Sequence, residues 1–273
     1  MLKILELFSG TKSVGKVCDQ LGWESVSVDL LLPADYQCDI MDFDYKQYDK
    51  DEFDIIWASP PCTNYSALKK CWFGRKLKNG IVYTKEQNEI DQNEADILVL
   101  KTLEIINYFD CKYWFMENPQ TGNLKNREIV KGIPFYDVDY CMYSDWGYKK
   151  RTRIWTNKED FEPKLCDNSG SCGNMIISTK QHNKVLANGY EIINGEKVVC
   201  NTKEKRKTLR KHKLNVSKDV HTVGEKKHKV DMSQVGCGSQ LNTEKDLKFL
   251  GKGTNRIDRY RIPEDLIFSL FLD

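Results

Sequence analysis

A short apolar run stopped by two prolines constrains the fold of this chain more than any other feature. Residues Phe53–Trp57 read as a buried strand, and Pro60 and Pro61 end it because proline cannot donate to a β ladder. Cys62 is thereby left at the carboxyl end of the strand, the edge at which open α/β sheets bind ligands. A thiol held on a stiff turn is well placed to act as a nucleophile. The same pattern also fits a plain turn followed by a buried thiol.

A second apolar run, Leu2–Leu7, leads directly into a loop of small residues and then a helix. Ser9, Gly10 and Ser13 allow a ligand to approach the backbone of this loop. Strand, glycine loop and helix in this order hold a nucleotide-like cofactor in many folds, although a tight turn without a ligand has the same signature. The loop lacks the Lys-Ser/Thr ending of a phosphate loop, which argues against a nucleotide triphosphatase.

Two further predicted strands each end in an acidic side chain. Ser25–Val28 ends in Asp29, which could accept hydrogen bonds from both hydroxyls of a ribose or could be an ordinary surface acid. Tyr113–Met116 ends in Glu117. A carboxyl group in an apolar strand mouth can exchange a proton near neutral pH, whereas a capping or ion-paired glutamate would have no such role. We expect Glu117 and Cys62 to share the carboxyl edge of one parallel sheet.

The intervening segments complete an alternating pattern of strands and helices. Residues 93–109 have the periodicity of an amphipathic helix, and residues 135–143 and 151–156 read as strands. Alternation along the last strand places Arg151 and Arg153 on one face, an arrangement that suits an oxyanion, a phosphate or a base carbonyl. The pattern predicts the α/β class with a doubly wound, Rossmann-like sheet.

The polar, lysine-rich segment 63–90 follows the proposed nucleophile. A segment of this length without strong periodicity is usually functional or disordered. Its glycines and lysines indicate a lid over a polyanion, and a solvated loop is the alternative.

Length and composition set the wider limits. A chain of 273 residues can form one large domain or two unequal ones, and 40% apolar with 30% charged residues is ordinary for a globular protein. No apolar run is long enough to span a bilayer and no signal peptide is recognisable, so we expect an intracellular protein without a membrane partner. The ten cysteines then indicate thiols, metal ligands or a nucleophile rather than a disulfide framework.

Residues 157–250 differ from the first half because they lack strong apolar periodicity. Within them, residues 201–230 hold eleven Lys and Arg against three Asp and Glu, a net charge of +8, which leaves −6 for the rest of the chain. This asymmetry predicts contact with phosphates, or else a solvated and partly disordered loop. Cys166, Cys172 and His182 could be three zinc ligands, with Cys200 as a fourth.

The motifs together resemble the cytosine-5 DNA methyltransferases, especially compact phage-like or virus-like members. The resemblance covers residues 2–156 with every element in the family's order, and it is carried by Phe8-Ser9-Gly10-x-x-Ser13, Asp29, Asp39-Ile40, Pro60-Pro61-Cys62, Glu117-Asn118 and Lys149-x-Arg151-x-Arg153. Ser13 stands where the family has a third glycine, and Lys149 stands where it usually has glutamine. The family's C-terminal motif, an Asn-containing helix, is not recognisable.

The resemblance implies a role for each matched residue. S-adenosylmethionine would be held by Phe8, Ser9, Gly10, Thr11, Ser13, Asp29, Asp39, Ile40 and Pro61. Cys62 would be the nucleophile and Glu117 would hydrogen-bond the target cytosine, while Arg151 and Arg153 would secure the active-site loop and the base carbonyl. We therefore expect a catalytic domain (1–157), a basic target-recognition insert (158–250) and a C-terminal helix that returns to the catalytic domain (251–273).

The activity implied is methyl transfer to carbon 5 of cytosine in double-stranded DNA, on a base flipped out of the duplex. The protein would act as a monomer in the cytoplasm of a bacterial, phage-infected or virus-infected cell, or in a nucleus. Two alternatives stay open. One is an RNA methyltransferase, since transfer-RNA enzymes share these motifs. The other is a catalytically weak relative that binds DNA without modifying it.

Overall fold

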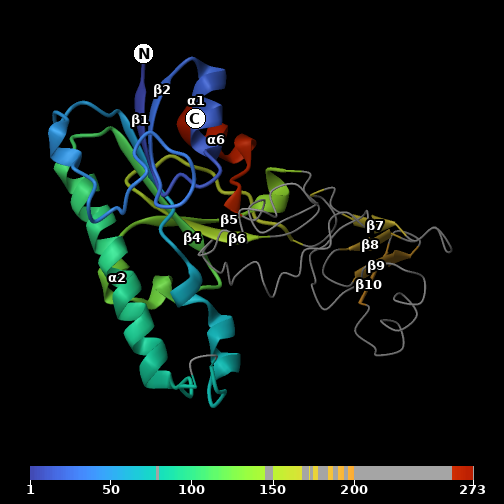
Figure 1. Ribbon diagram of the computed structural model, residues 1–273. Coiled ribbons are helices and arrows are strands. Elements are labelled where there is room, and N and C mark those ends of the chain that lie inside the picture. Colours follow the sequence, from blue (N-terminus) through green and yellow to red (C-terminus); the bar gives the residue numbers. More distant parts are fainter. Residues whose placement is uncertain are drawn as a thin grey trace.

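The computed structural model describes residues 1–77, 80–144, 150–167, 172, 175–177, 184–186, 190–193, 196–199 and 260–272. Its main body is a six-stranded sheet flanked by helices on both faces (Figure 1). The strands are β1 (Lys3–Leu7), β2 (Glu24–Val28), β3 (Ile55–Ala58), β4 (Tyr113–Pro119), β5 (Phe135–Asp139) and β6 (Arg151–Thr156), and the helices are α1 (Ser13–Leu21), α2 (Lys85–Tyr108) and α6 (Glu264–Leu272). The predicted α/β class is confirmed.

The strand order is β2-β1-β3-β4-β6-β5, and the first four strands run parallel to one another. Strand β6 is antiparallel to both of its neighbours, β4 and β5. The order reverses on the two sides of β1, so that β1 and β3 form the switch point at which open α/β sheets leave a crevice for ligands.

Alternate residues of the central strands supply two separate cores. Leu5 and Ile56 pack with Val99 and Ile106 of α2 on one face of the sheet. On the other face, Ile4 and Trp57 pack with α1 and α6. This follows from the two-residue repeat of a strand, which sends neighbouring side chains to opposite faces. Strands with apolar residues at every position are therefore covered by helices on both sides.

Helix α2 begins eight residues earlier than the sequence pattern predicts. The hydroxyl of Thr84 accepts a hydrogen bond from the amide of Gln87 at 3.1 Å and so caps the helix at Lys85. Two apolar residues of this helix, Ile97 and Leu100, are about half exposed, because its buried side runs through Ala95, Val99 and Thr102.

Strand β5 is shorter than predicted, because the chain turns at Asp139 into a 3₁₀ turn, η6 (Tyr140–Met142). Within the insert, four short strands form a second, antiparallel sheet of order β10-β9-β8-β7. These strands are β7 (Met175–Ile177), β8 (Lys184–Leu186), β9 (Tyr190–Ile193) and β10 (Glu196–Val199). They are too short to produce a recognisable periodicity in the sequence. None of the helices in the described part of the chain is both long and apolar enough to cross a bilayer.

Candidate active site

Cys62 lies where the sequence places it, on the loop that leaves the carboxyl end of β3. It is half-buried and stands immediately before the 3₁₀ turn η2 (Thr63–Tyr65), with φ −91° and ψ −6°. The loop is fixed to the neighbouring strand by a buried hydrogen bond, in which the side-chain amide of Asn118 donates to the carbonyl of Pro60 at 2.9 Å. The thiol position is thus set by two parallel strands and a proline-stiffened backbone.

Glu117 is buried at the end of β4 and is held by two side chains. The hydroxyl of Tyr140 donates to Glu117 Oε1 at 3.0 Å, and Lys150 Nζ lies 3.4 Å from the same oxygen. The side chains of Glu117 and Lys150 are only 8% and 9% exposed. A buried ion pair of this kind persists only when both partners are present, because either charge alone would be costly to bury.

A cavity of about 190 Å³ joins these groups to the glycine loop. Its walls come from the ends of β1, β2, β3 and β4 and from the segment before α6. The lining residues are Glu6, Phe8, Ser9, Gly10, Ser13, Asp29, Leu30, Leu31, Leu32, Ser59, Pro60, Pro61, Cys62, Thr63, Glu117, Pro119, Lys150, Tyr260 and Ile262. Cys62 and Glu117 therefore face the same space as the predicted cofactor loop.

The loop after β1 has an unusual backbone. Phe8, Gly10 and Lys12 all have left-handed φ values, of 56°, 51° and 53°. Such a conformation costs free energy in non-glycine residues, and residues held in it cluster at active sites and ligand sites. The buried hydroxyl of Ser9 has no hydrogen-bond partner among the described residues. Ser9 lines the cavity, so a bound ligand could satisfy its hydroxyl.

Asp29 is oriented by backbone amides at the mouth of the cavity. Its Oδ1 accepts hydrogen bonds from Leu31 and Leu32 at 2.9 and 2.7 Å, and its Oδ2 accepts one from Gly10 at 2.8 Å. A carboxylate has about four acceptor positions. One position on Oδ2 is therefore left for a ligand hydroxyl.

Glu6 is a cavity residue that the sequence analysis did not single out. It faces the α1 side of the sheet, where its carboxylate accepts hydrogen bonds from the first amides of α1, those of Val14 and Gly15, at 3.2 and 3.0 Å. The Glu6 carboxylate thus occupies the N-terminus of α1, which is the end of a helix that attracts anions. Burial nevertheless raises the pKa of Glu6 to about 7. The available signal was a single acidic residue among the apolar residues Ile4, Leu5 and Leu7 of β1.

This raised pKa makes the stability of the fold depend on pH. An unfolded chain releases the Glu6 proton near pH 4.5, whereas the folded chain retains it until about pH 7. The free energy of unfolding should therefore fall by at most about 3 kcal/mol as the pH rises from 4.5 to about 7. Above this range Glu6 should change it no further. We expect urea unfolding of the wild type to show this loss relative to Glu6→Gln, which has no ionisable group at the position. Parallel pH profiles for the two proteins would contradict the assignment.

One comparison with known proteins decides the family. The chain is 46% identical over 176 residues to a probable DNA (cytosine-5)-methyltransferase of Frog virus 3 (isolate Goorha), and the match covers 64% of this chain and 79% of that protein. The chain belongs to the cytosine-5 DNA methyltransferase family. The resemblance inferred from the motifs is confirmed, including its virus-like character, and the activity is that of a cytosine-5 methyltransferase.

The other comparisons do not identify the family. No family model matches the chain. The S. pombe Dnmt2 methyltransferase and a Spodoptera frugiperda DNMT2 mutant are similar solved structures, with TM-scores of 0.33 and 0.34 and identities of 13% and 18%. They match 62% and 61% of this chain, which spans about half of their own lengths, 53% and 54%.

Six of the nine residues that the cytosine-5 methyltransferase motifs assign to the cofactor line the cavity, namely Phe8, Ser9, Gly10, Ser13, Asp29 and Pro61. Thr11 does not line it, but its hydroxyl lies 3.0 Å from that of Ser13. Asp39 accepts a hydrogen bond from the amide of Met41 at 2.9 Å, and Ile40 is buried in the core that packs against α2. The structure does not bring these last two residues to the cavity.

The predicted arginine pair also lies away from the cavity. Arg151 forms two hydrogen bonds to Asp139, and Arg153 forms two to Asp137 while stacking 3.5 Å from the ring centroid of Phe135. Arg153 faces Asn118 in the sheet register, and so lies on the opposite face from Glu117. The assignment of both arginines to the methyltransferase site remains a prediction. Lys149 lies outside the described residues.

Lys150 is the basic side chain that the sequence analysis missed. It precedes Arg151, is buried, and reaches the cavity beside Glu117. The available signal was the two-residue alternation of a strand. It places the residues next to Arg151 and Arg153, Lys150 among them, on the opposite face of the sheet from the two arginines.

The segment after Cys62 is more structured than a free lid. It forms η2 and a second 3₁₀ turn, η3 (Ala67–Trp72), and buried Lys69 binds Asp91 of α2 at 2.6 Å. Lys70, Arg75 and Lys76 are exposed and could still meet a polyanion, while Lys78 lies outside the described residues.

The C-terminal segment returns to the catalytic sheet. Helix α6 packs beside α1, the amide of Ile262 donates to Ser13 Oγ at 3.1 Å, and Phe271 stacks on Trp23 at 5.9 Å. Tyr260 and Ile262 line the cavity. These two residues line the same cavity as the loop after β1, even though the C-terminal family motif is not recognisable.

The predicted zinc ligands are only partly within the described residues. Cys166 and Cys172 lie close together, but the third thiol beside them is Cys141, which the sequence analysis did not include. His182 and Cys200 lie outside the described residues.

Proposed function

We propose that the protein transfers the methyl group of S-adenosylmethionine to carbon 5 of cytosine in DNA, through a covalent bond between Cys62 and a flipped base. The observation that supports this most is the sharing of one cavity by Cys62, Glu117 and the loop after β1. A cofactor on that loop and a base between Cys62 and Glu117 would share this cavity, as direct methyl transfer between them requires.

The chain's residues fit S-adenosylmethionine. The unpartnered hydroxyl of Ser9 and the spare acceptor of Asp29 suit the polar groups of the ligand, and Phe8, Leu30 and Ile262 provide apolar surface. The first amides of α1 are taken by Glu6, which fits a ligand without a phosphate. The bound cofactor supplies an electrophilic methyl group on a sulfonium.

Cys62 makes carbon 5 reactive. Carbon 5 of cytosine is a poor nucleophile until a thiolate adds to carbon 6, which places an electron pair on the N3 side of the ring. Glu117 stabilises that pair by a hydrogen bond or a proton at N3. Carbon 5 then takes the methyl group and loses its proton to water. The double bond re-forms as the Cys62 thiolate leaves, and a proton placed on N3 returns to Glu117. None of these bonds can form within a stacked duplex, so the base must be flipped out.

We assign Lys150 to this site as a positioning residue for Glu117 and a donor to the base carbonyl. An ammonium group has three donors, and the Glu117 contact uses one of them. Lys150→Met should lower kcat by about 10²-fold, the size typical of a lost charge-stabilising donor, with little change in KM for S-adenosylmethionine. Lys158, a second buried lysine outside the cavity, is the matched control. Equal kcat values for Lys150→Met and Lys158→Met would contradict the assignment.

DNA is the favoured acceptor because the named relative is a probable DNA (cytosine-5)-methyltransferase. The net charge of +8 over residues 201–230 of the insert suits a nucleic acid. Positive charge neutralises the phosphates of either nucleic acid, so it does not distinguish DNA from RNA. The choice of DNA over RNA therefore rests on the similarity to the Frog virus 3 protein.

The test compares acceptors directly. Purified full-length protein is incubated with tritiated S-adenosylmethionine and either cytosine-rich duplex DNA or a mixture of transfer RNAs, and the digested product is identified. We expect label in 5-methylcytosine from DNA at low salt, falling steeply as salt is raised. Label in RNA alone would replace the DNA proposal by the RNA alternative. No label in either, with no cofactor binding by calorimetry, would favour the non-enzymatic relative.

A further inference from the structure

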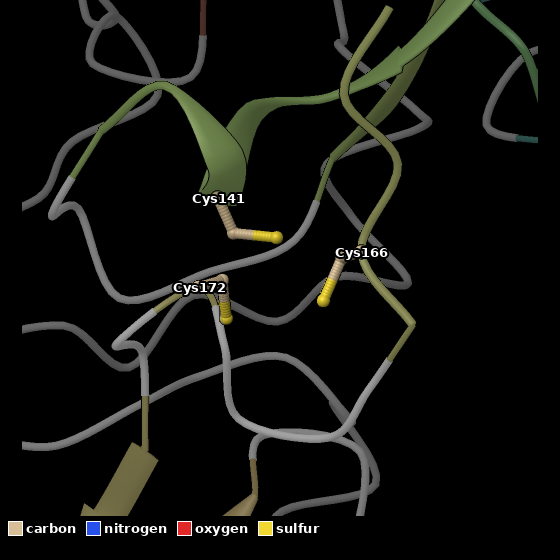
Figure 2. Close-up of side chains that lie close together, drawn as sticks. All are labelled: Cys141, Cys166 and Cys172. Atoms are coloured by element: carbon tan, nitrogen blue, oxygen red, sulfur yellow. The ribbon is translucent and has the colours of Figure 1, made fainter.

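Three cysteines from separate segments meet beside the catalytic sheet. Cys141 lies in η6, Cys166 follows β6, and Cys172 stands three residues before β7. Their sulfur atoms all lie within 4.8 Å of one another and face a common space (Figure 2). Cys141 and Cys166 are 3% and 7% exposed, and Cys172 is half-buried.

The positions of the first two thiols are fixed by hydrogen bonds that do not involve sulfur. The amide of Cys166 donates to Asp139 Oδ2 at 2.9 Å, and the amide of Asp139 donates to the carbonyl of Lys164 at 3.2 Å. The Lys164 amide in turn donates to the hydroxyl of Tyr143 at 2.8 Å. These hydrogen bonds therefore hold the segment that contains Cys166 against the turn that contains Cys141.

Three convergent thiols have few structural explanations. One disulfide would use two of them and leave the third. A tetrahedral Zn²⁺ with bonds of about 2.3 Å needs sulfur atoms about 3.8 Å apart, so spacings of at most 4.8 Å require only small side-chain movements. Three thiolates exceed the charge of Zn²⁺ by one. Arg151 lies beside the cluster, where it interacts electrostatically with Cys166 and also balances the buried carboxylate of Asp139.

We propose that Cys141, Cys166 and Cys172 bind one Zn²⁺ as thiolates and that this ion fastens the start of the insert to the end of the catalytic sheet. Each thiol gives up its proton to solvent on binding, and no oxidation is involved. The sequence pattern Cys166-x5-Cys172 supplies two ligands, and the fold supplies the third from 25 residues upstream. This site is independent of the methyl-transfer proposal because none of its ligands lines the cavity.

The test measures metal, not activity. Full-length protein is purified without chelator, reconstituted with zinc, desalted and analysed by elemental mass spectrometry. We expect one zinc per chain in the wild type, and we expect Cys141→Ser and Cys172→Ser to lose it. Cys111→Ser, which changes a half-buried cysteine elsewhere, should retain the full equivalent. Circular dichroism of each variant separates loss of metal from loss of fold.

A second readout uses the wild-type protein alone. Alkylation of the native protein followed by peptide mass spectrometry should leave these three cysteines unmodified until a chelator is added. Co²⁺ in place of zinc should give the charge-transfer absorption of three thiolate ligands. Zinc-free wild type after reconstitution, a variant that keeps its zinc, or a Cys141–Cys166 disulfide in freshly purified protein would each overturn the proposal.

Discussion

Replacing Cys62 by alanine should abolish methyl transfer, with a loss of at least about 10⁴-fold in kcat, the scale seen when a covalent nucleophile is removed. The physical reason is that no other group in the described cavity carries a thiol, so carbon 5 of the target base would never gain the electron pair of the covalent adduct. Binding of S-adenosylmethionine should be nearly unchanged, because Ser9 and Asp29 are contributed by other strands. Tritium incorporation and calorimetry measure the two effects separately.

Cys38→Ala is the matched control for this variant, since Cys38 is also half-buried and lies outside the cavity. It should retain wild-type activity. DNA that carries 5-fluorocytosine provides an independent check, because fluorine at carbon 5 cannot leave as a proton does and the adduct accumulates. We expect a denaturant-stable complex with the wild type and with Cys38→Ala. Residual methylation by Cys62→Ala would refute the role of this thiol.

Replacing Glu117 by glutamine should lower kcat by about 10²–10³-fold, in the range for loss of a group that stabilises charge in the transition state. An amide of the same shape cannot give a proton to N3 of the base. The change should also reduce folding stability, because Lys150 would be left buried without its carboxylate. Leaving one partner of a buried ion pair unpaired costs about 3–5 kcal/mol.

The double variant Glu117→Gln with Lys150→Met separates the two consequences. Removal of both charges should restore most of the stability lost in Glu117→Gln, as measured by urea unfolding, because no unpaired charge remains. Activity should stay at or below the level of Glu117→Gln. Recovery of activity along with stability would mean that Glu117 acts only through the fold. Additive losses of stability would mean that the two side chains are not coupled.

The sequence alone determined the order of the strands along the chain, the class of the fold and the position of the proposed nucleophile. These features depend on local chemistry. Prolines stop β3 before Cys62, and the apolar runs of β1, β3 and β4 identify strands buried on both faces. The motif residues Phe8, Asp29 and Glu117 then meet at one cavity because parallel strands present their carboxyl ends along a single edge.

Only the tertiary structure decided which basic side chain stands beside Glu117 and which thiol joins Cys166 and Cys172. Lys150 lines the cavity and Arg153 does not, because the register of β6 against β4 places Arg153 on the face of the sheet opposite Glu117. Cys141 meets Cys166 because the chain after β6 runs back to the end of β5, where Asp139 is hydrogen-bonded to the backbone of Lys164 and Cys166. Register and long-range contact are properties of paired strands, and neither leaves a periodic signal in the sequence of one strand.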